Sequence, residues 1–231
     1  MSQPISRSTP LTAEGELTAM TQELLILATA APAARPEAFI TVQGLGEYHR
    51  VTRTYETWKA SGGDENGSLL IIAGSNTSED TFVEMTKANL IGVFGFHEED
   101  FAKLGEQIII QPSAINTPDQ AKWVARVLEE YNISLAAFGV TTYHLLRAFC
   151  TLLAEQRRAG TLGNTLVVPR LMDMPPTDII PETGVSYGDA IGGELARMLK
   201  YAAQGDVATC EEFMDYAARL RSADVLHLTA R

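Results

Sequence analysis

The sequence is poor in cysteine and in positive charge, and it has no long apolar run. Cys150 and Cys210 are its two cysteines, and they show no C-x-x-C spacing, so we expect neither a cysteine metal site nor a thiol redox motif. The formal net charge is -11. This acidic balance argues against nucleic acid as the main partner, because phosphate backbones bind basic surfaces. The longest apolar stretch, residues 24–34, is too short to span a bilayer.

We expect no signal peptide either. The first ten residues, MSQPISRSTP, contain no apolar core resembling a signal peptide. The scarcity of cysteine is typical of reducing compartments. We therefore expect a cytoplasmic protein without a membrane anchor.

Several familiar enzyme motifs are absent or lack the structural context that they need. The one G-x-S-x-G match, GVSYG (184–188), does not follow a predicted strand, as the strand-to-helix elbow of an α/β-hydrolase requires, so the sequence does not support that interpretation. The segment GSNTSED (74–80) lacks the G-K-[ST] ending of a Walker A loop, and Gly44 and Gly46 lack the third glycine of a dinucleotide fingerprint. The histidines show no recognisable metal-ligand spacing.

What the sequence does contain is a regular alternation of short apolar runs and helical patterns. Runs rich in Val, Ile and Leu predict five strands, near residues 38–43, 69–73, 107–111, 135–140 and 165–168. Helical spacing occurs between them, over 47–61, 78–93, 117–132 and 143–160. Continuous apolar strands separated by helices indicate a parallel sheet covered on both faces. The expected fold class is α/β: a Rossmann-like, doubly wound, mainly parallel five-stranded sheet with added N- and C-terminal helices.

The remaining segments suggest how the chain is organised. Residues 1–10 are predicted to be a flexible lead-in, and 11–35 an N-terminal helix with Thr12 as a plausible N-cap. The α/β ligand-binding domain is expected over 36–172. Residues 173–231 are expected to form a crossing segment and two helices, within 187–222, that pack on the same domain or cover its ligand edge.

Polar or glycine-rich segments follow four of the predicted strands. In doubly wound folds ligands bind beyond the carboxyl ends of the strands, at helix N-termini whose free N–H groups carry partial positive charge. Hydroxyl groups and the permanent charge of Arg147 add to that field, which suits an anionic small molecule. The candidate ligand-binding residues are Gly44, Gly46, Gly74, Ser75, Asn76, Asn116, Thr117, Thr141 and Thr142, and the candidate catalytic residues are His144, Arg147, Asp119 and Glu79.

Each candidate has a structural alternative. Ser75, Thr117 and Thr142 are types of residue that commonly serve as helix N-caps. His144 alone is more often a structural hydrogen-bonding residue than a catalyst. Arg147 would tie two helices together if it paired with a carboxylate such as Glu47 or Asp119.

Set in order, these motifs resemble the YdcF/SanA/ElyC-like family, bacterial α/β proteins with a domain of unknown function. The closest match is TTYHLLRA (141–148), which carries Tyr143, His144, Arg147 and Ala148 of the family's T-S-x-Y-H-x-x-R-A element and has Thr141 at its serine position. IAGS keeps Gly74 of a second motif, and AINTPDQ keeps Asn116 and Thr117 of a third, with Ala114, Asp119 and Gln120 departing from it.

The resemblance covers roughly residues 38–170 and implies the α/β fold and a site at these motifs. Many relatives carry an N-terminal membrane anchor and are linked to cell-envelope biogenesis, so this chain resembles the soluble branch. The family has no settled reaction, and S-adenosylmethionine or a nucleotide is among the cofactors proposed for it.

Three functions therefore remain open from the sequence. The first is binding of a nucleotide-like, S-adenosylmethionine-like or other anionic small molecule at the carboxyl edge of the sheet. The second is phosphoryl or glycosyl-phosphate transfer or hydrolysis linked to envelope metabolism, in which Arg147 holds the phosphate, His144 acts as acid or base, and Glu79 or Asp119 orients a metal or water. The third is a non-catalytic interaction module that docks a partner through the C-terminal helices.

Overall fold

The structure is a computed structural model that describes residues 13–103, 106–172 and 174–227. The predicted lead-in over residues 1–10 and the predicted cap at Thr12 lie outside these ranges.

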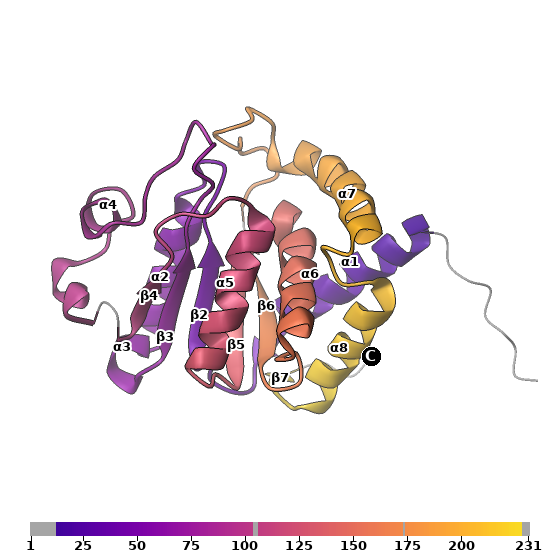
Figure 1. Ribbon diagram of the computed structural model, residues 1–231, viewed down its shortest axis with the longest axis horizontal. Coiled ribbons are helices and arrows are strands. Elements are labelled where there is room, and N and C mark those ends of the chain that lie inside the picture. Colours follow the sequence, from indigo (N-terminus) through magenta and orange to yellow (C-terminus); the bar gives the residue numbers. More distant parts are fainter. Residues whose placement is uncertain (1–12, 104–105, 173, 228–231) are drawn as a thin grey trace, which may run out of the picture.

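Five parallel strands form the central sheet, as the sequence predicts. They are β2 (Ala38–Val42), β3 (Leu69–Ala73), β4 (Ile108–Ile110), β5 (Leu135–Thr141) and β6 (Leu166–Met172). Their order in the sheet is β4-β3-β2-β5-β6, and each neighbouring pair is parallel (Figure 1). The chain builds outward from β2 to β4, then returns to the other side of β2 and builds outward again. The direction of winding therefore reverses between β2 and β5, which is the topological switch point of a doubly wound fold.

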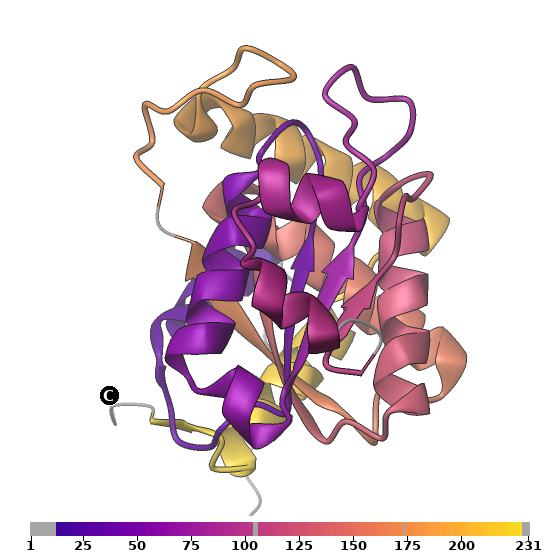
Figure 2. The ribbon, with the colours of Figure 1, turned by 90° about the vertical axis from the view of Figure 1, so that its left-hand side faces the viewer.

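Helices cover both faces of this sheet, and successive strand residues divide between them. Phe39, Leu70 and Ile72 pack with residues of α2 (His49–Ala60) and α4 (Lys87–Gly92), next to η1 (Glu98–Lys103). Ile40 and Ile71 pack instead with α5 (Thr117–Glu130) and α6 (Thr142–Ala159). Figure 2 shows α2 on one side of the strands and α5 on the other. Alternation along a strand sends neighbouring side chains to opposite faces, and burial of both faces explains the unbroken apolar runs.

The terminal helices join the same core. The core residues Leu24 and Leu27 of α1 (Ala13–Thr29) and Phe213 and Leu220 of α8 (Cys210–Ser222) are buried with residues of the sheet and α6. A two-residue antiparallel pair, β1 (Ala31–Pro32) with β7 (Leu226–His227), links the two ends. The helix α7 (Tyr187–Gln204) lies over α6 (Figure 1). A short helix, α3 (Gly63–Asn66), precedes β3.

The predicted helix over residues 78–93 is wrong in its first half. Only α4 is helical there, and it begins after Thr86, whose side chain accepts a hydrogen bond from the Asn89 N–H. The preceding loop is held by a tertiary contact, because the Glu182 carboxylate accepts hydrogen bonds from the backbone N–H groups of Asp80 and Thr81 at 2.9 Å each. A helix would need those groups for its own ladder or its own cap.

The N-cap of α5 also differs from the expected Thr117. Asn116 takes that role, and its side-chain oxygen accepts a hydrogen bond from the Asp119 N–H at 2.9 Å. Pro118 then stands at the start of the helix, where its missing N–H costs nothing. The hydroxyl of Thr117 is left available for a tertiary contact.

Among the described residues, no helix is both long enough and apolar enough to cross a membrane.

Candidate functional site

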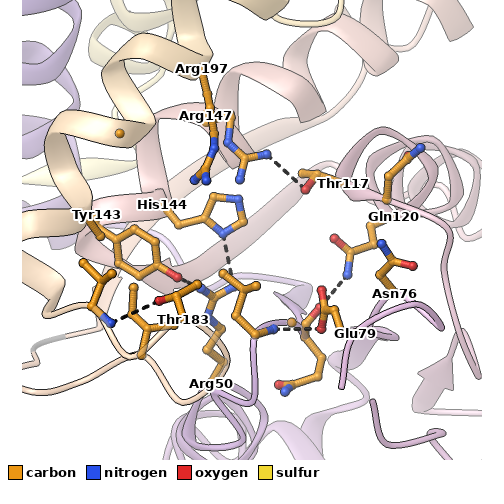
Figure 3. Close-up of a pocket in the computed structure, with 18 of the residues that line it drawn as sticks. Arg50, Asn76, Glu79, Thr117, Gln120, Tyr143, His144, Arg147, Thr183 and Arg197 are labelled. Carbon is orange, nitrogen blue, oxygen red and sulfur yellow. Dashed lines mark hydrogen bonds between the residues drawn. The ribbon is translucent and has the colours of Figure 1, made fainter. Parts of the chain in front are cut away.

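A pocket of about 460 Å³ opens at the carboxyl ends of β2 and β5, at the switch point of the sheet. Four strand ends or helix starts contribute to it, and residues 180–185 together with α7 cover it (Figure 3). The residues that carry polar or charged groups into its lining are Gln43, Arg50, Asn76, Glu79, Asn116, Thr117, Gln120, Tyr143, His144, Arg147, Thr183, Asp189, Arg197 and Tyr201. Ligands of doubly wound proteins bind in this crevice, so the fold and the cavity point to the same place.

The floor of the pocket is a buried polar network centred on Arg50. Its guanidinium forms an ion pair with Glu47, three positions earlier, and both side chains are fully buried. It also donates to Thr141 Oγ1 at 2.9 Å and to Tyr143 Oη at 3.0 Å. Burial opposes the charged form, but Glu47, Tyr143 and Tyr187 together outweigh it, and the pKa of Arg50 is raised. Arg50 is therefore a fixed cation that joins α2 to the end of β5 and the start of α6.

His144 lies on top of this network. Its Nδ1 is 3.1 Å from Arg50 Nη1. Its Nε2 is buried and has no hydrogen-bond partner among the described residues. Burial, followed by the charges of Arg147, Arg50 and Arg197, holds the pKa of His144 well below its ordinary value. The imidazole is therefore neutral at neutral pH.

Two arginines next to His144 share one carboxylate. Arg147 Nε binds Glu194 Oε2 and Arg197 Nη1 binds Glu194 Oε1, each at 2.5 Å. The side chains of Arg147 and Glu194 are 12% and 4% exposed, whereas that of Arg197 is 54% exposed. Arg147 also donates to Thr117 Oγ1 at 3.1 Å. Figure 3 shows both guanidinium groups on the same side of the pocket as His144. The cluster carries one net positive charge.

Arg147 thus has the helix-tying contact that the sequence left open, with a different partner. The expected partners Glu47 and Asp119 are wrong, because Glu47 is taken by Arg50 and Asp119 accepts a hydrogen bond from the Ile115 N–H at 3.1 Å. Glu194 on α7 lies far along the chain, and α7 packs directly against α6.

The other side of the pocket carries amides and a carboxylate. Glu79 accepts a hydrogen bond from the Leu45 N–H at 2.8 Å, and burial raises its pKa. Gln120 Nε2 donates to the carbonyls of Gln43 and Gly74 at 2.6 Å each, which holds the ends of β2 and β3 together. Both side-chain amide atoms of Gln43 are buried without a partner among the described residues. Unsatisfied buried polar groups in a pocket wall are suited to pairing with a ligand.

Residues 180–185 form the roof of the pocket, and Glu182 attaches this segment to the rest of the site. Besides the two backbone N–H groups of Asp80 and Thr81, its carboxylate accepts a hydrogen bond from Thr81 Oγ1 at 2.5 Å. Figure 1 shows the loop after β3 and the 174–186 segment meeting above the upper ends of the strands. Gly46 permits this closeness, since its φ is 73° and an added Cβ would lie 2.8 Å from Pro181 Cβ.

The structure brings together about half of the residues predicted for the site. Those that line the pocket are Gly44, Asn76, Glu79, Asn116, Thr117, His144 and Arg147, whereas Gly46, Gly74, Ser75, Asp119, Thr141 and Thr142 do not. Thr142 is exposed and Thr141 is committed to Arg50. A Cβ on Gly74 would lie 2.6 Å from the Gln111 carbonyl oxygen, so Gly74 serves the packing of two loops.

Sequence reasoning did not include Arg50, Tyr143, Glu194 and Arg197 among the candidate site residues. The pair Glu47 and Arg50, three positions apart and directly after a strand, was a usable signal for a buried contact at the edge of the sheet. Nothing local marked Glu194 and Arg197, because i,i+3 pairs of this kind are ordinary on solvated helices. Their role arises from the packing of α7 onto α6.

No three His, Cys, Asp or Glu side chains of the described ranges are grouped in a way that would hold a metal ion. In the comparisons with known proteins, no family model and no curated protein matches the sequence.

Proposed function

We propose that the chain binds an anionic small molecule, nucleotide-like or S-adenosylmethionine-like, in the pocket at the switch point. The observation that carries this proposal is the pair of guanidinium groups of Arg147 and Arg197, which line the pocket and share the single carboxylate of Glu194. In a protein of formal net charge -11, a locally positive wall favours a ligand with negative charge.

The surroundings support the same ligand class. The first turns of α5 and α6 both begin at the pocket, through Thr117 and Tyr143. Helix N-termini favour phosphate and carboxylate groups, because their free N–H groups and dipoles point at the ligand. A volume of about 460 Å³ suits a mononucleotide-sized ligand, within the usual range of ligand pockets. Gln43 and Glu79 supply hydrogen-bonding groups for a polar sugar or base.

Phosphate-bearing ligands have more support than S-adenosylmethionine. The sulfonium of that cofactor is a cation, and the nearest charges around His144 are the cations Arg50, Arg147 and Arg197. The likeness of TTYHLLRA to the YdcF/SanA/ElyC-like family supports a ligand site at this segment without indicating a reaction. Phosphoryl transfer with His144 as a base has less support, because burial and three arginines disfavour its protonated form.

Blocking the pocket tests the proposal. Gly193 lines the pocket, Gly192 does not, and an added Cβ at either position meets no atom within 4 Å. We expect wild type and Gly192→Phe to bind AMP saturably in titration calorimetry, and Gly193→Phe to lose at least about tenfold in affinity through steric exclusion. Inorganic phosphate and S-adenosylmethionine serve as further probes. Absence of saturable binding of all three by wild type, or equal affinities of the two variants, would overturn the proposal.

A further inference from the structure

We propose that His144 is a permanent hydrogen-bond donor to an oxyanion of the ligand, with its proton held on Nε2 by Arg50, and that it is a binding residue rather than a proton acceptor. This inference rests on the proposed function, because it names the chemical group that the same pocket recognises.

The hydrogen bond between Arg50 and His144 has only one possible direction, from Arg50 to His144. A guanidinium has five N–H donors and no lone pair to accept with. At 3.1 Å from Arg50 Nη1, Nδ1 of His144 must therefore be the acceptor. A neutral imidazole whose Nδ1 accepts carries its proton on Nε2.

Arg50 can neither move away from His144 nor change its protonation. Its guanidinium is held by Glu47 in a fully buried ion pair and donates to Thr141 and Tyr143. Rotating the imidazole by half a turn would place a carbon against Arg50 Nη1 and leave that N–H without this acceptor. The network below the ring therefore selects both its orientation and its tautomer.

The side of the His144 ring that carries Nε2 has no protein partner among the described residues. His144 lines the pocket, its residue is only 5% exposed, and Nε2 is buried without a partner among the described residues. A buried N–H lacking an acceptor is unfavourable, and a ligand oxygen placed there would remove that cost. Thr117, Arg147 and Arg197 line the same cavity, so the oxygen would belong to a group that also attracts guanidinium groups.

The charges around the ring keep it neutral over the working pH range. Arg50 from α2, Arg147 from α6 and Arg197 from α7 all oppose protonation, and together with burial they lower the pKa of His144. The carboxylates next to this cluster, Glu47 and Glu194, are each paired with an arginine. His144 therefore neither gains a proton near neutral pH nor offers a lone pair to the pocket.

This arrangement specifies the ligand chemistry. An acceptor oxygen of a phosphate or carboxylate satisfies Nε2–H, whereas an ammonium or amide N–H at that position would face another donor. A deprotonated phosphate monoester group is the class that the donors from His144, Arg147 and Thr117 favour.

The tautomer is tested on the ligand-free full chain by long-range ¹H–¹⁵N correlation spectra of histidine, with the His144 signals assigned by their loss in His144→Gln. We expect the neutral Nε2–H pattern to persist from pH 8 down to about pH 5.5, a unit below the ordinary histidine pKa. A neutral Nδ1–H pattern, or conversion to imidazolium at the ordinary histidine pKa, would overturn the assignment without bearing on whether the pocket binds anions.

The role in binding is tested with AMP and inorganic phosphate. A glutamine at position 144 can place its amide N–H near the position of Nε2, whereas an asparagine is too short to do so. We expect His144→Gln to stay within about threefold of wild type, and His144→Asn to lose between about ten- and a hundredfold, as for a hydrogen bond to a charged group. Thermal unfolding of both variants controls for misfolding.

Equal affinities of the two variants and wild type would overturn the role of His144 while leaving the pocket as an anion site. Failure of wild type to bind either probe would overturn the proposed function and, with it, the ligand contact of His144.

Discussion

The hydroxyl of Tyr143 donates a hydrogen bond to the carboxylate of Glu47 over 2.7 Å, although the two residues are 96 positions apart. Glu47 follows β2 and Tyr143 opens α6, so this contact joins the two halves of the sheet across the switch point. The same carboxylate holds the buried Arg50. The polar network at the floor of the pocket therefore also connects the two halves of the sheet.

The first prediction concerns the loss of the charge on Glu47. Glu47→Gln leaves the fully buried Arg50 without its counter-charge, so the free energy of unfolding should fall by about 3–5 kcal/mol. Urea denaturation measures this change. The matched control is Glu98→Gln, which removes an 80% exposed carboxylate that pairs with Lys87 and should cost less than about 1 kcal/mol. Similar losses in the two variants would contradict a role for Glu47 as the internal counter-ion.

The second prediction separates two roles of the arginine cluster. Arg147→Ala should lower both the melting temperature and the affinity for AMP, because Arg147 ties α6 to Glu194 on α7 and also faces the pocket. Arg197→Ala should weaken AMP binding while changing the unfolding free energy by less than about 1 kcal/mol, because its side chain is half exposed. Titration calorimetry and thermal melts on the same preparations give both readouts. Unchanged affinity in both variants would leave the cluster as a helix tie alone.

The third prediction is the pH dependence of stability. The pKa of His144 is lowered in the folded protein, chiefly by burial. Just below the ordinary histidine pKa, the unfolded chain therefore binds a proton at His144 that the folded chain does not bind. The contribution of His144 is fully present above the unfolded pKa and is lost as the pH falls below it. Stability should decline below about pH 6.5 with a slope of up to about 1.4 kcal/mol per pH unit from this residue.

His144→Gln should flatten that slope, as measured by urea denaturation between pH 7.5 and 5. His49→Gln is the comparison, since burial also lowers the pKa of this histidine, but its ring is less deeply buried. An unchanged slope in His144→Gln would show that the ring takes up a proton in the folded protein.

The fourth prediction compares two glycines. Gly74→Ala places a Cβ 2.6 Å from the Gln111 carbonyl and 2.8 Å from the Ser113 backbone, so we expect a loss of about 1–3 kcal/mol through overpacking. Gly192→Ala adds a methyl group to α7 with nothing within 4 Å, and should gain about 0.5–1 kcal/mol of helix propensity. Urea denaturation of both variants checks the opposite signs. A stabilised Gly74→Ala variant would mean that the loops after β3 and β4 separate readily.

The fold was predictable because its signal is local and repeated. Each of the five strands is a short, mainly apolar run, and β2, β3 and β5 are buried at every position. The strand β3 (Leu69–Ala73) coincides with the predicted 69–73. The loop containing Asp80 and Thr81 was wrongly predicted as a helix. Its hydrogen-bond partner, Glu182, lies about 100 positions away, and no local sequence pattern indicates that contact.

The site was predictable in position but only partly in membership. Strand ends place His144 and Asn116 at the same edge, which follows from topology alone. The pairing of Arg147 with Glu194 depends on where α7 packs, and the burial of Arg50 depends on Thr141 and Tyr143 arriving from the other half of the sheet. Such long-range contacts have no spacing rule in the sequence.

The hydrogen bonds of Glu182 to Asp80 and Thr81 should affect how fast a ligand enters and leaves the pocket. The roof of the pocket is fastened at this point by three hydrogen bonds to one carboxylate. Glu182→Ala should therefore speed both entry and escape of AMP in stopped-flow experiments, so that the residence time shortens more than the equilibrium affinity changes. The lifetime of the complex would then be set by a side chain that never touches the ligand.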